Sequence, residues 1–448
     1  MKFFKAVIVT FLTIESKLIL RKYKPFIVAV TGSVGKTSTK DAIYSVLKDH
    51  GRYVRKSDKS MNSETGLPLT IIGVPNAWRS MSGWLRNIVK GAGLILKKKE
   101  YPDVLVLEIG ADHPNDIKKI VKWLRPDISV ITQVSDTPVH VEFFPSPDDV
   151  FEEKASLATA VKDGGRLILF ADNEKVLSMS DRVKNRNVKV ISYGASDKAE
   201  IKGTDYQPVY SLQELPTGDN LPQFSNPKVP VGFTFNLTLN GSVYPVSISG
   251  ILGKTYMFPL LAAGAVGWAR NIPIIDILNG LNSYMPPRGR MNILSGTNNS
   301  TIIDDSYNSS PDAVLSALGT LKGLNCSGTK IAVLGDMMEL GQYSAEEHRN
   351  VGREVFGATD ELITVGQRSR ATADEAVKTG LPVSRVHSFD TSVEAGDYLK
   401  SIIKSGDTVL IKGSQSIRME RAVAMIMTNP ETAVDTLVRQ EKEWLEKK

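Results

Sequence analysis

Short apolar runs alternate with amphipathic stretches along most of the chain. This pattern is typical of a mostly parallel sheet whose faces are covered by helices. We therefore predict an α/β protein with two doubly wound units, the second of them Rossmann-like. The first series of predicted strands lies at residues 26–30, 104–108, 128–132, 166–171 and 189–193, and the second at residues 301–304, 330–334, 361–365, 385–389 and 407–411.

Between about residues 200 and 250 apolar and polar residues alternate instead, and Asn240-Gly241 is a strong signal for a two-residue hairpin. A small antiparallel insert is predicted there. A polar break at residues 296–300 precedes the next apolar strand. We expect an N-terminal amphipathic helix at residues 1–24, a central domain at residues 25–298 that contains the insert, and a C-terminal domain at residues 299–448.

The clearest motif connects the first predicted strand to a helical pattern at residues 41–47. It resembles a shortened P-loop, Gly-x-x-Gly-Lys-Thr, because position 30 is valine where the longer form has glycine. Its glycines would let backbone N–H groups point at phosphate oxygens, its lysine would reach the β- and γ-phosphates, and its threonine hydroxyl would bind Mg²⁺. An ordinary Gly/Ser turn is the alternative. The predicted ATP-binding residues here are Thr31, Gly32, Ser33, Val34, Gly35, Lys36, Thr37 and Ser38.

Charge and cysteine content narrow the choice of partners. The net charge of +6 suits anionic small-molecule substrates, and no basic block is interleaved with aromatic residues, so a nucleic-acid partner is not expected. The single cysteine, Cys326, cannot form an intramolecular disulfide or a cysteine-cluster zinc site, which is consistent with a reducing compartment.

The first 24 residues superficially resemble a signal peptide, but no small-residue cleavage site follows the apolar run, and the run is too short to span a bilayer. Export would also separate the protein from ATP. We expect a cytoplasmic protein whose N-terminal helix packs on the next domain or lies on the inner face of the membrane. The cations near the end of this helix are Lys17, Arg21, Lys22 and Lys24.

Three further residues of the central domain are candidates for chemistry. Glu108 ends a buried strand, where a bound metal would remove the cost of burying an unpaired carboxylate, so it is a candidate Mg²⁺ ligand. His140 follows the next strand, and Lys154 lies in a helical pattern. For these two, spacing alone favours ordinary structural roles.

In the C-terminal domain, acidic residues follow two predicted strands at residues 304–311 and 335–341. The carboxyl ends of parallel strands meet at one edge of a sheet, so a ligand crevice is expected there. A glycine turn with two cations at residues 412–420 adds a further anion-binding arrangement at the same edge.

Together these motifs resemble the Mur ligase family, ATP-dependent amide ligases of peptidoglycan precursor synthesis, and most closely its D-alanyl-D-alanine-adding branch. The resemblance extends from about residue 25 to residue 425. It rests on the shortened P-loop, on Asn62-Ser63-Glu64-Thr65-Gly66-Leu67-Pro68-Leu69-Thr70, and on the three C-terminal segments at residues 304–311, 335–341 and 412–420.

The resemblance implies roles for individual residues. Lys36 and Thr37 would hold ATP phosphates and Mg²⁺ with Glu108 on the metal, His140 would bind a second Mg²⁺, and Lys154 would supply a carbamate ligand. Nucleotide contacts are implied for Asp172, Asn173, Arg290 and Asp305. Substrate contacts are implied for Asn62, Glu64, Asn308, Asp336, Glu339 and Arg418.

The implied activity is the addition of D-alanyl-D-alanine to the carboxylate of a UDP-muramoyl peptide through an acyl phosphate, by a monomer. Members of this branch carry a UDP-sugar-binding domain ahead of the P-loop, whereas one helix precedes it here, so the grip on a UDP-linked acceptor stays open. Two alternatives remain at this point: the same chemistry on a polyglutamate- or folate-like acceptor, and a non-catalytic nucleotide-binding protein at the membrane.

Overall fold

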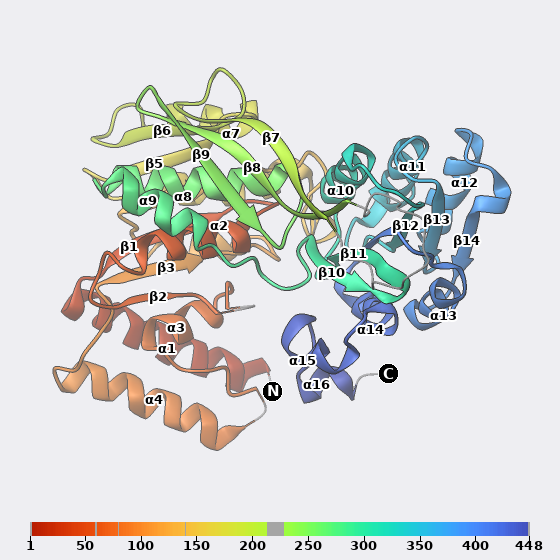
Figure 1. The fold of residues 1–448 in the computed structure, drawn as a ribbon. Helices are drawn as coiled ribbons and strands as arrows, with labels where there is room; N and C mark the ends of the chain where they lie inside the picture. Colours follow the sequence, from red (N-terminus) through yellow and green to blue (C-terminus); the bar gives the residue numbers. More distant parts are fainter. Residues whose placement is uncertain (1, 59–60, 79, 139, 213–227, 447–448) are drawn as a thin grey trace. The chain divides into compact units, whose positions relative to one another are not determined.

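The structure is a computed structural model that describes residues 2–58, 61–78, 80–138, 140–212 and 228–446. It divides into two units (Figure 1). The first comprises Met1–Thr204, Asn236–Val246 and Tyr256–Met285. The second comprises Asp205–Phe235, Ser247–Thr255 and Pro286–Lys448.

A nine-stranded sheet has the order β2-β3-β1-β4-β5-β6-β7-β8-β9, and its strands from β2 to β7 pair in parallel. Strands β1 to β6 lie in the first unit, whereas the residues of β7, β8 and β9 are divided between the two units. The predicted parallel α/β fold is confirmed, and β2 was not predicted. The strands are β1 (Phe26–Thr31), β2 (Val54–Lys56), β3 (Val104–Glu108), β4 (Ile128–Ile131), β5 (Arg166–Phe170), β6 (Lys189–Gly194), β7 (Ile201–Leu212), β8 (Lys228–Leu239) and β9 (Ser242–Ser249).

Helices of the first unit form three packed groups: α2 with α8 and α9, α5 with α6, and α1 with α3 and α4. Glycines bring the first group close together, since a Cβ on Gly280 would lie 2.6 Å from Val46 Cα. The helices are α1 (Lys2–Tyr23), α2 (Lys36–Leu47), α3 (Gly66–Ile72), α4 (Met81–Leu96), α5 (Asp116–Val121), α6 (Pro147–Ala160), α7 (Glu174–Leu177), α8 (Met257–Ala269) and α9 (Ile274–Asn282).

The hairpin signal is confirmed by the structure. Asn240 and Gly241 have φ angles of 51° and 76° and join β8 directly to β9. Positive φ at both central residues is the requirement of the turn type that fits the twist of a hairpin. The part of the predicted insert at residues 213–227 lies outside the described residues.

The second unit contains a six-stranded sheet in the order β10-β11-β15-β12-β13-β14, parallel except for the β10–β11 pair. This confirms a Rossmann-like C-terminal fold. Strand β10 was not predicted. The last and longest segment of the second unit begins at Pro286, which is ahead of the polar break near residue 298. The strands are β10 (Asn292–Gly296), β11 (Ser300–Asp305), β12 (Lys330–Gly335), β13 (Glu361–Val365), β14 (Val386–Phe389) and β15 (Thr408–Lys412).

Apolar residues from the strands of this second sheet and from α13 and α14 form its core. The helices are α10 (Pro311–Gly323), α11 (Ser344–Val355), α12 (Arg370–Lys378), α13 (Ser392–Ile402), α14 (Glu420–Ile426), α15 (Ala433–Thr436) and α16 (Lys442–Leu445).

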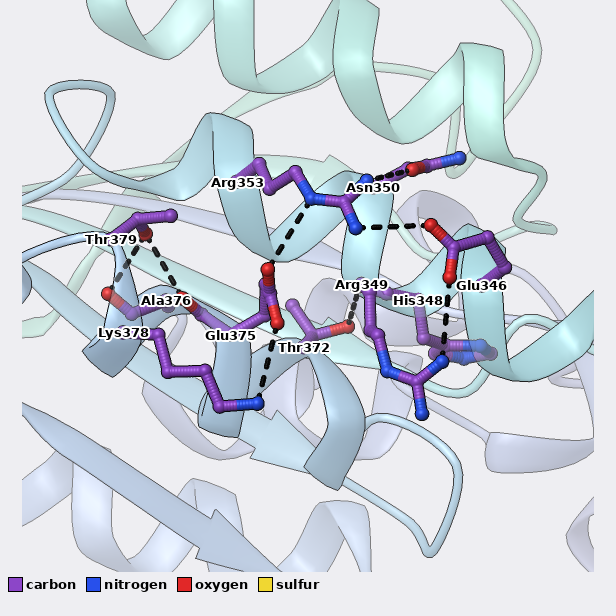
Figure 2. A network of polar contacts seen from close by, with 10 residues as sticks. All are labelled: Glu346, His348, Arg349, Asn350, Arg353, Thr372, Glu375, Ala376, Lys378 and Thr379. Atoms are coloured by element: carbon purple, nitrogen blue, oxygen red, sulfur yellow. Dashed lines mark hydrogen bonds and ion pairs between the residues drawn. The ribbon is translucent and has the colours of Figure 1, made fainter.

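Polar contacts join α11 to α12 in the second unit (Figure 2). Arg353 bridges the two helices, because its guanidinium lies 3.0 Å from Glu346 in α11 and 3.3 Å from Glu375 in α12. Thr372 Oγ1 donates a hydrogen bond to the His348 carbonyl at 2.9 Å. These contacts fix the position of His348, whose imidazole supports a loop described below.

Candidate functional site

The P-loop connects β1 to α2 and adopts a conformation that its two glycines allow. Gly35 has φ 82° directly before α2, and Gly32 has φ 150°. A Cβ on Gly32 would lie 1.9 Å from Thr132 Oγ1, so a larger residue does not fit there. The first turn of α2 offers N–H groups without intrahelical acceptors, and the helix dipole adds partial positive charge. The loop therefore has the geometry of a phosphate cradle.

Hydrogen bonds to the segment after β4 hold this loop in place. The N–H groups of Ser33 and Val34 donate to the Gln133 carbonyl at 2.7 and 3.3 Å, and Thr132 Oγ1 donates to the Val34 carbonyl at 2.7 Å. Lys36 Nζ turns back and donates to two carbonyls of the loop at 2.9 and 3.2 Å. A phosphate bound by Lys36 would replace these two carbonyls as its acceptors.

Glu108 ends β3, and the parallel register places it beside Val30, directly before the P-loop. Its side chain is buried, its Oε1 accepts a hydrogen bond from Asn62 Nδ2 at 3.1 Å, and Lys40 Nζ lies 3.9 Å from its Oε2. The structure thus brings Asn62 and Glu108 together at the P-loop. Sequence reasoning missed Lys40, although its spacing of four residues from Lys36 places both lysines on one face of α2.

Lys154 is a buried lysine of α6. Its pKa is lowered to about 7, first by burial and then by the Lys36 ammonium, while the carboxylates of Asp112 and Glu153 act in the opposite direction. His140 Nε2 lies 3.5 Å from Asp112 Oδ1. The structure therefore places Lys36, Lys154, Asp112 and His140 in one neighbourhood. Asp112, which follows β3 only four residues after Glu108, was not singled out from the sequence.

Glu153 precedes Lys154 in α6 and ties this helix to α5. It accepts hydrogen bonds from the Asn115 N–H at 3.0 Å and the Lys118 N–H at 2.9 Å. A carboxylate at a helix N-terminus is favoured by the helix dipole. Glu153 therefore positions the loop that carries Asp112 relative to Lys154.

Three other candidates of the first unit have contacts that serve the local fold. The Asp172 carboxylate accepts hydrogen bonds from the backbone at residues 195 and 196. Asn173 caps α7 and donates to the Val134 carbonyl at 2.8 Å. Glu64 is half exposed and lies 3.7 Å from Lys119 Nζ. Asn173 alone among them contacts the segment after β4 that supports the P-loop.

In the second unit, Asp305 ends β11 and forms a buried ion pair with Lys412, which ends the neighbouring strand β15. Lys412 Nζ lies 2.7 Å from Asp305 Oδ2 and donates to the Asn308 carbonyl at 2.8 Å. Burial lowers the pKa of Lys412, and Asp305 opposes this shift. Asp304 beside them is fully buried, and burial raises its pKa to about 6. The predicted strand-end cluster thus contains Asp305, Asn308 and Lys412.

Arg418 is held in a second buried cluster of this unit. Its Nε donates to the Glu420 carboxylate, and its Nη1 donates to the Trp444 carbonyl at 2.8 Å. The other Glu420 oxygen lies 3.0 Å from Arg439 Nη1. Burial lowers the pKa of Arg439. Glu420 lies in the predicted anion-binding segment at residues 412–420 but was not itself predicted to have a role. No local pattern in the sequence indicated Arg439 or Trp444.

The loop after β12 carries the next two candidates. The buried Asp336 carboxylate accepts a hydrogen bond from the Ser369 N–H at 2.7 Å. His348 Nε2 accepts from the Met337 N–H at 3.0 Å, so this imidazole is neutral and its Nδ1 faces the Ser344 carbonyl at 2.7 Å. Glu339 follows in left-handed conformation, with φ 63°.

Arg290 belongs to the second unit, where its guanidinium lies over the Tyr307 ring at 4.3 Å. Tyr307 follows the Asp304–Asp305 strand end, and the Arg290 charge contributes to the lowered pKa of Lys412. Arg290 is therefore close to the strand-end cluster. The geometry of an arginine over an aromatic ring is a favourable cation–π contact.

The residues at the P-loop fit one Mg²⁺ ion shared with bound phosphates. Glu108 offers a buried carboxylate, and the Thr37 hydroxyl makes no hydrogen bond within the described part of the chain. Hard cations favour such oxygen ligands together with phosphate oxygens. Among the described residues no three His, Cys, Asp or Glu side chains could hold a metal by themselves. A metal here would thus depend on oxygens of the nucleotide.

Comparison with known proteins places these features in one family. The profile of the Mur ligase middle domain matches residues 30–237, and that of the Mur ligase, glutamate ligase domain matches residues 289–415. The UDP-N-acetylmuramoyl-tripeptide--D-alanyl-D-alanine ligase of Bacillus subtilis is 26% identical over 416 residues, covering 93% of this chain and 79% of that protein. The Mycobacterium leprae protein of the same name is 28% identical over 409 residues, covering 87% and 71%.

Solved structures share the fold. MurF from Acinetobacter baumannii has a TM-score of 0.73 at 21% identity, with 93% of this chain and 80% of that chain covered. MurF ligase from Thermotoga maritima in complex with ADP has a TM-score of 0.71 at 24% identity, covering 93% and 83%. Both domain profiles, the extent of the sequence matches and the P-loop geometry agree with one another. The chain belongs to the Mur ligase family.

Proposed function

We propose that this protein is an ATP-dependent amide ligase that joins D-alanyl-D-alanine to the terminal carboxylate of a UDP-N-acetylmuramoyl tripeptide. One observation carries the proposal: over nine tenths of its length the chain aligns with a ligase named for this reaction. The P-loop, which has the geometry of a phosphate cradle, agrees with an ATP-dependent activity. The alignment covers both domains and favours this acceptor over a polyglutamate- or folate-like one.

The proposed reaction has two steps. A carboxylate oxygen of the tripeptide takes the γ-phosphoryl group of ATP, which releases ADP and forms an acyl phosphate. The amine of D-alanyl-D-alanine then attacks the acyl carbon, the amide bond forms, and inorganic phosphate leaves. Transfer between negatively charged oxygens needs positioning and charge neutralisation more than covalent participation by the protein.

Roles follow for the residues of the first unit. Lys36 and the N–H groups of α2 would bind the ATP phosphates, and Glu108 with Thr37 would hold Mg²⁺, which neutralises charge on the phosphates when bound. When no metal is bound, the Lys40 ammonium would balance the negative charge of the Glu108 carboxylate, from which it lies 3.9 Å. We assign His140 and Lys154 to a second cation. An ammonium at Lys154 would repel a cation, whereas its lowered pKa favours the neutral amine that reacts with CO₂ to form a carbamate.

Roles in the second unit are assigned from the strand-end cluster. We propose that Arg290 and Asp305 contact the nucleotide, and that Asn308, Asp336, Glu339 and Arg418 hold the dipeptide. Asn62 and Glu64 would contact the tripeptide, and Asp172 and Asn173 would shape the nucleotide site. For location and state we propose a cytoplasmic monomer in peripheral contact with a membrane. Among the described residues, no helix has the length and apolarity to cross a bilayer.

The test measures ADP release by the purified full-length chain. We expect release only when UDP-N-acetylmuramoyl tripeptide and D-alanyl-D-alanine are both present, and we expect Lys36→Ala to abolish it. The matched control is Lys48→Ala, because Lys48 lies at the other end of α2, where its Nζ donates to Ser283 Oγ at 3.2 Å. ADP release that is indifferent to D-alanyl-D-alanine, or that requires a glutamate donor instead, would overturn the assigned substrates.

A further inference from the structure

A basic pocket lies in the first unit at the edge of the sheet opposite the P-loop. Its volume is about 480 Å³, and it is lined by Pro25 and Ile27 at the start of β1 and by residues that precede β4 and β5. The P-loop follows the other end of β1, and six strand residues span about 20 Å. The pocket is therefore separate from the proposed ATP site. The cations that line it are Lys17, Arg21, Lys24, Lys122, Arg125 and Lys162.

Little negative charge balances these cations. Asp127 lies beside the pocket, but one carboxylate oxygen accepts from the Ile27 N–H at 2.8 Å and the other lies 2.9 Å from Lys162 Nζ. Within the described part of the chain, the other five cations have no carboxylate within ion-pair distance. Five uncompensated charges around one pocket favour a ligand that carries several negative charges.

Helix α1, which supplies two of these cations and directly precedes Lys24, also exposes an apolar stripe. Val7, Phe11, Ile14 and Leu18 of α1 are 37–54% exposed, and their spacing places them on one face. The opposite face, with Ile8, Leu12 and Ile19, is buried. Lys17 and Arg21 lie along the edge of the exposed face, and Lys24 follows the end of the helix. The outer side of α1 thus carries apolar residues flanked by cations.

Helix α4 packs beside α1 (Figure 1). Gly91 permits the close approach, since a Cβ there would lie 2.2 Å from Glu15 Oε2. Lys22 Nζ fixes the far end by donating to the carbonyls of Leu94 and Ile95 at 2.9 and 2.8 Å. Exposed apolar residues again follow helical spacing, and they are Met81, Leu85 and Val89, each more than 60% exposed.

We propose that α1, α4 and the basic pocket form a docking surface for a membrane that contains anionic phospholipids, with lipid phosphates bound at the pocket. Amphipathic helices bind in this way when an apolar face is flanked by Lys and Arg. The charge decides between occupants, because a second copy of this chain would bring the same uncompensated cations into contact with each other. Trp123, half buried at the pocket, is a residue type that favours the membrane–water boundary.

This inference develops the membrane contact proposed above and does not depend on ligase activity. The test is co-sedimentation of the full chain with vesicles of phosphatidylcholine alone and with vesicles in which about a third of the lipid is phosphatidylglycerol. We expect binding only to the anionic vesicles. The triple variant Lys17→Gln/Arg21→Gln/Arg125→Gln should bind about 100-fold more weakly, because each cation near an anionic surface contributes about five-fold. Phe11→Ser/Leu18→Ser should weaken binding at least about ten-fold, because it removes two apolar side chains that would be buried in the membrane.

Matched controls separate this site from general charge. Lys322→Gln/Lys400→Gln/Lys404→Gln removes the same charge from exposed lysines of the second unit, and Val243→Ser/Val383→Ser removes two exposed valines elsewhere. Both controls should bind anionic vesicles like the unaltered chain. Circular dichroism melting should show that all variants fold, and ADP release without vesicles should be unchanged in all of them.

Three results would overturn the proposal. The first is that the unaltered chain does not bind anionic vesicles, even if its pocket binds inorganic phosphate. The second is an equal loss of binding in the charge control. The third is a concentration-dependent dimer in light scattering that Phe11→Ser/Leu18→Ser abolishes, which would assign the apolar face to a second copy of the chain. None of these results bears on whether the protein is a ligase.

Discussion

The ion pair between Asp305 and Lys412 gives a quantitative test of how the strand-end cluster is built. The side chains are 6% and 1% exposed, and the charged atoms lie 2.7 Å apart. At an effective dielectric constant near 20, two unit charges at this distance attract each other by about 6 kcal/mol. Removing two ions from water costs several kcal/mol each, so the intact pair contributes little net stability. Removing one partner should therefore cost much more than removing both.

We expect Lys412→Met to lower the free energy of unfolding of the second unit by about 3–5 kcal/mol, because it leaves Asp305 buried beside Asp304 without a counter-charge. The double variant Asp305→Asn/Lys412→Met should recover at least about 2 kcal/mol of this loss. Lys330→Met is the matched control, since Lys330 begins the adjacent strand β12 and is only half buried. It should cost less than about 1 kcal/mol.

Hydrogen exchange followed by mass spectrometry measures these differences unit by unit. Peptides from β11 and β15 report on the second unit, while peptides from β1 and β3 serve as an internal reference in the first. A loss below about 1 kcal/mol for Lys412→Met would refute the reasoning, because it would mean that water reaches Asp305 in the folded state. Asp305 would then be available to a ligand without first leaving Lys412.

Three further predictions concern the loops around the site. Burial lowers the pKa of His348, so the contribution of this residue to the stability of the second unit should be complete above about pH 6.5 and should be lost as the pH falls. The reason is that the imidazole binds a proton more readily in the unfolded chain than in the folded one. Urea titrations should show a weaker pH dependence of the free energy of unfolding in His348→Gln. Glu108→Gln should retain the Asn62 hydrogen bond and the melting temperature. If Glu108 holds Mg²⁺ as proposed, the variant should reduce ligation by about 10- to 100-fold, and unchanged turnover would contradict that role. Gly35→Ala should lower the free energy of unfolding by about 1–2 kcal/mol, because only the left-handed φ of Gly35 opposes a side chain there. In Gly32→Ala the new Cβ would also clash with Thr132, so calorimetry should detect no ADP binding. Equal effects of the two variants would contradict the loop geometry.

Much of the fold was predictable because its strands are buried on both faces and therefore appear as continuous apolar runs. The two strands that were missed lack this signal. Strand β2 is the three residues Val54–Lys56, and Arg55 donates to the Thr70 and Ile71 carbonyls at 3.1 and 2.9 Å. Strand β10 lies at the edge of its sheet and is only partly buried. Both depend on pairing with a neighbour, which no local pattern in the sequence contains.

The same distinction explains which parts of the site the sequence could reveal. The register of a parallel sheet places Glu108 beside Val30, so a carboxylate that ends a predicted strand can be assigned to the P-loop edge from the strand pattern alone. Lys154 lies on a helix, and only the packing of α6 shows that it is buried near the Lys36 charge. Because burial and a neighbouring cation both oppose its protonation, the structure gives Lys154 a chemical character that its position in a charged helix did not indicate. A lysine kept partly neutral by burial and by the Lys36 charge is thus a property of three-dimensional packing, whereas the position of Glu108 is a property of strand order.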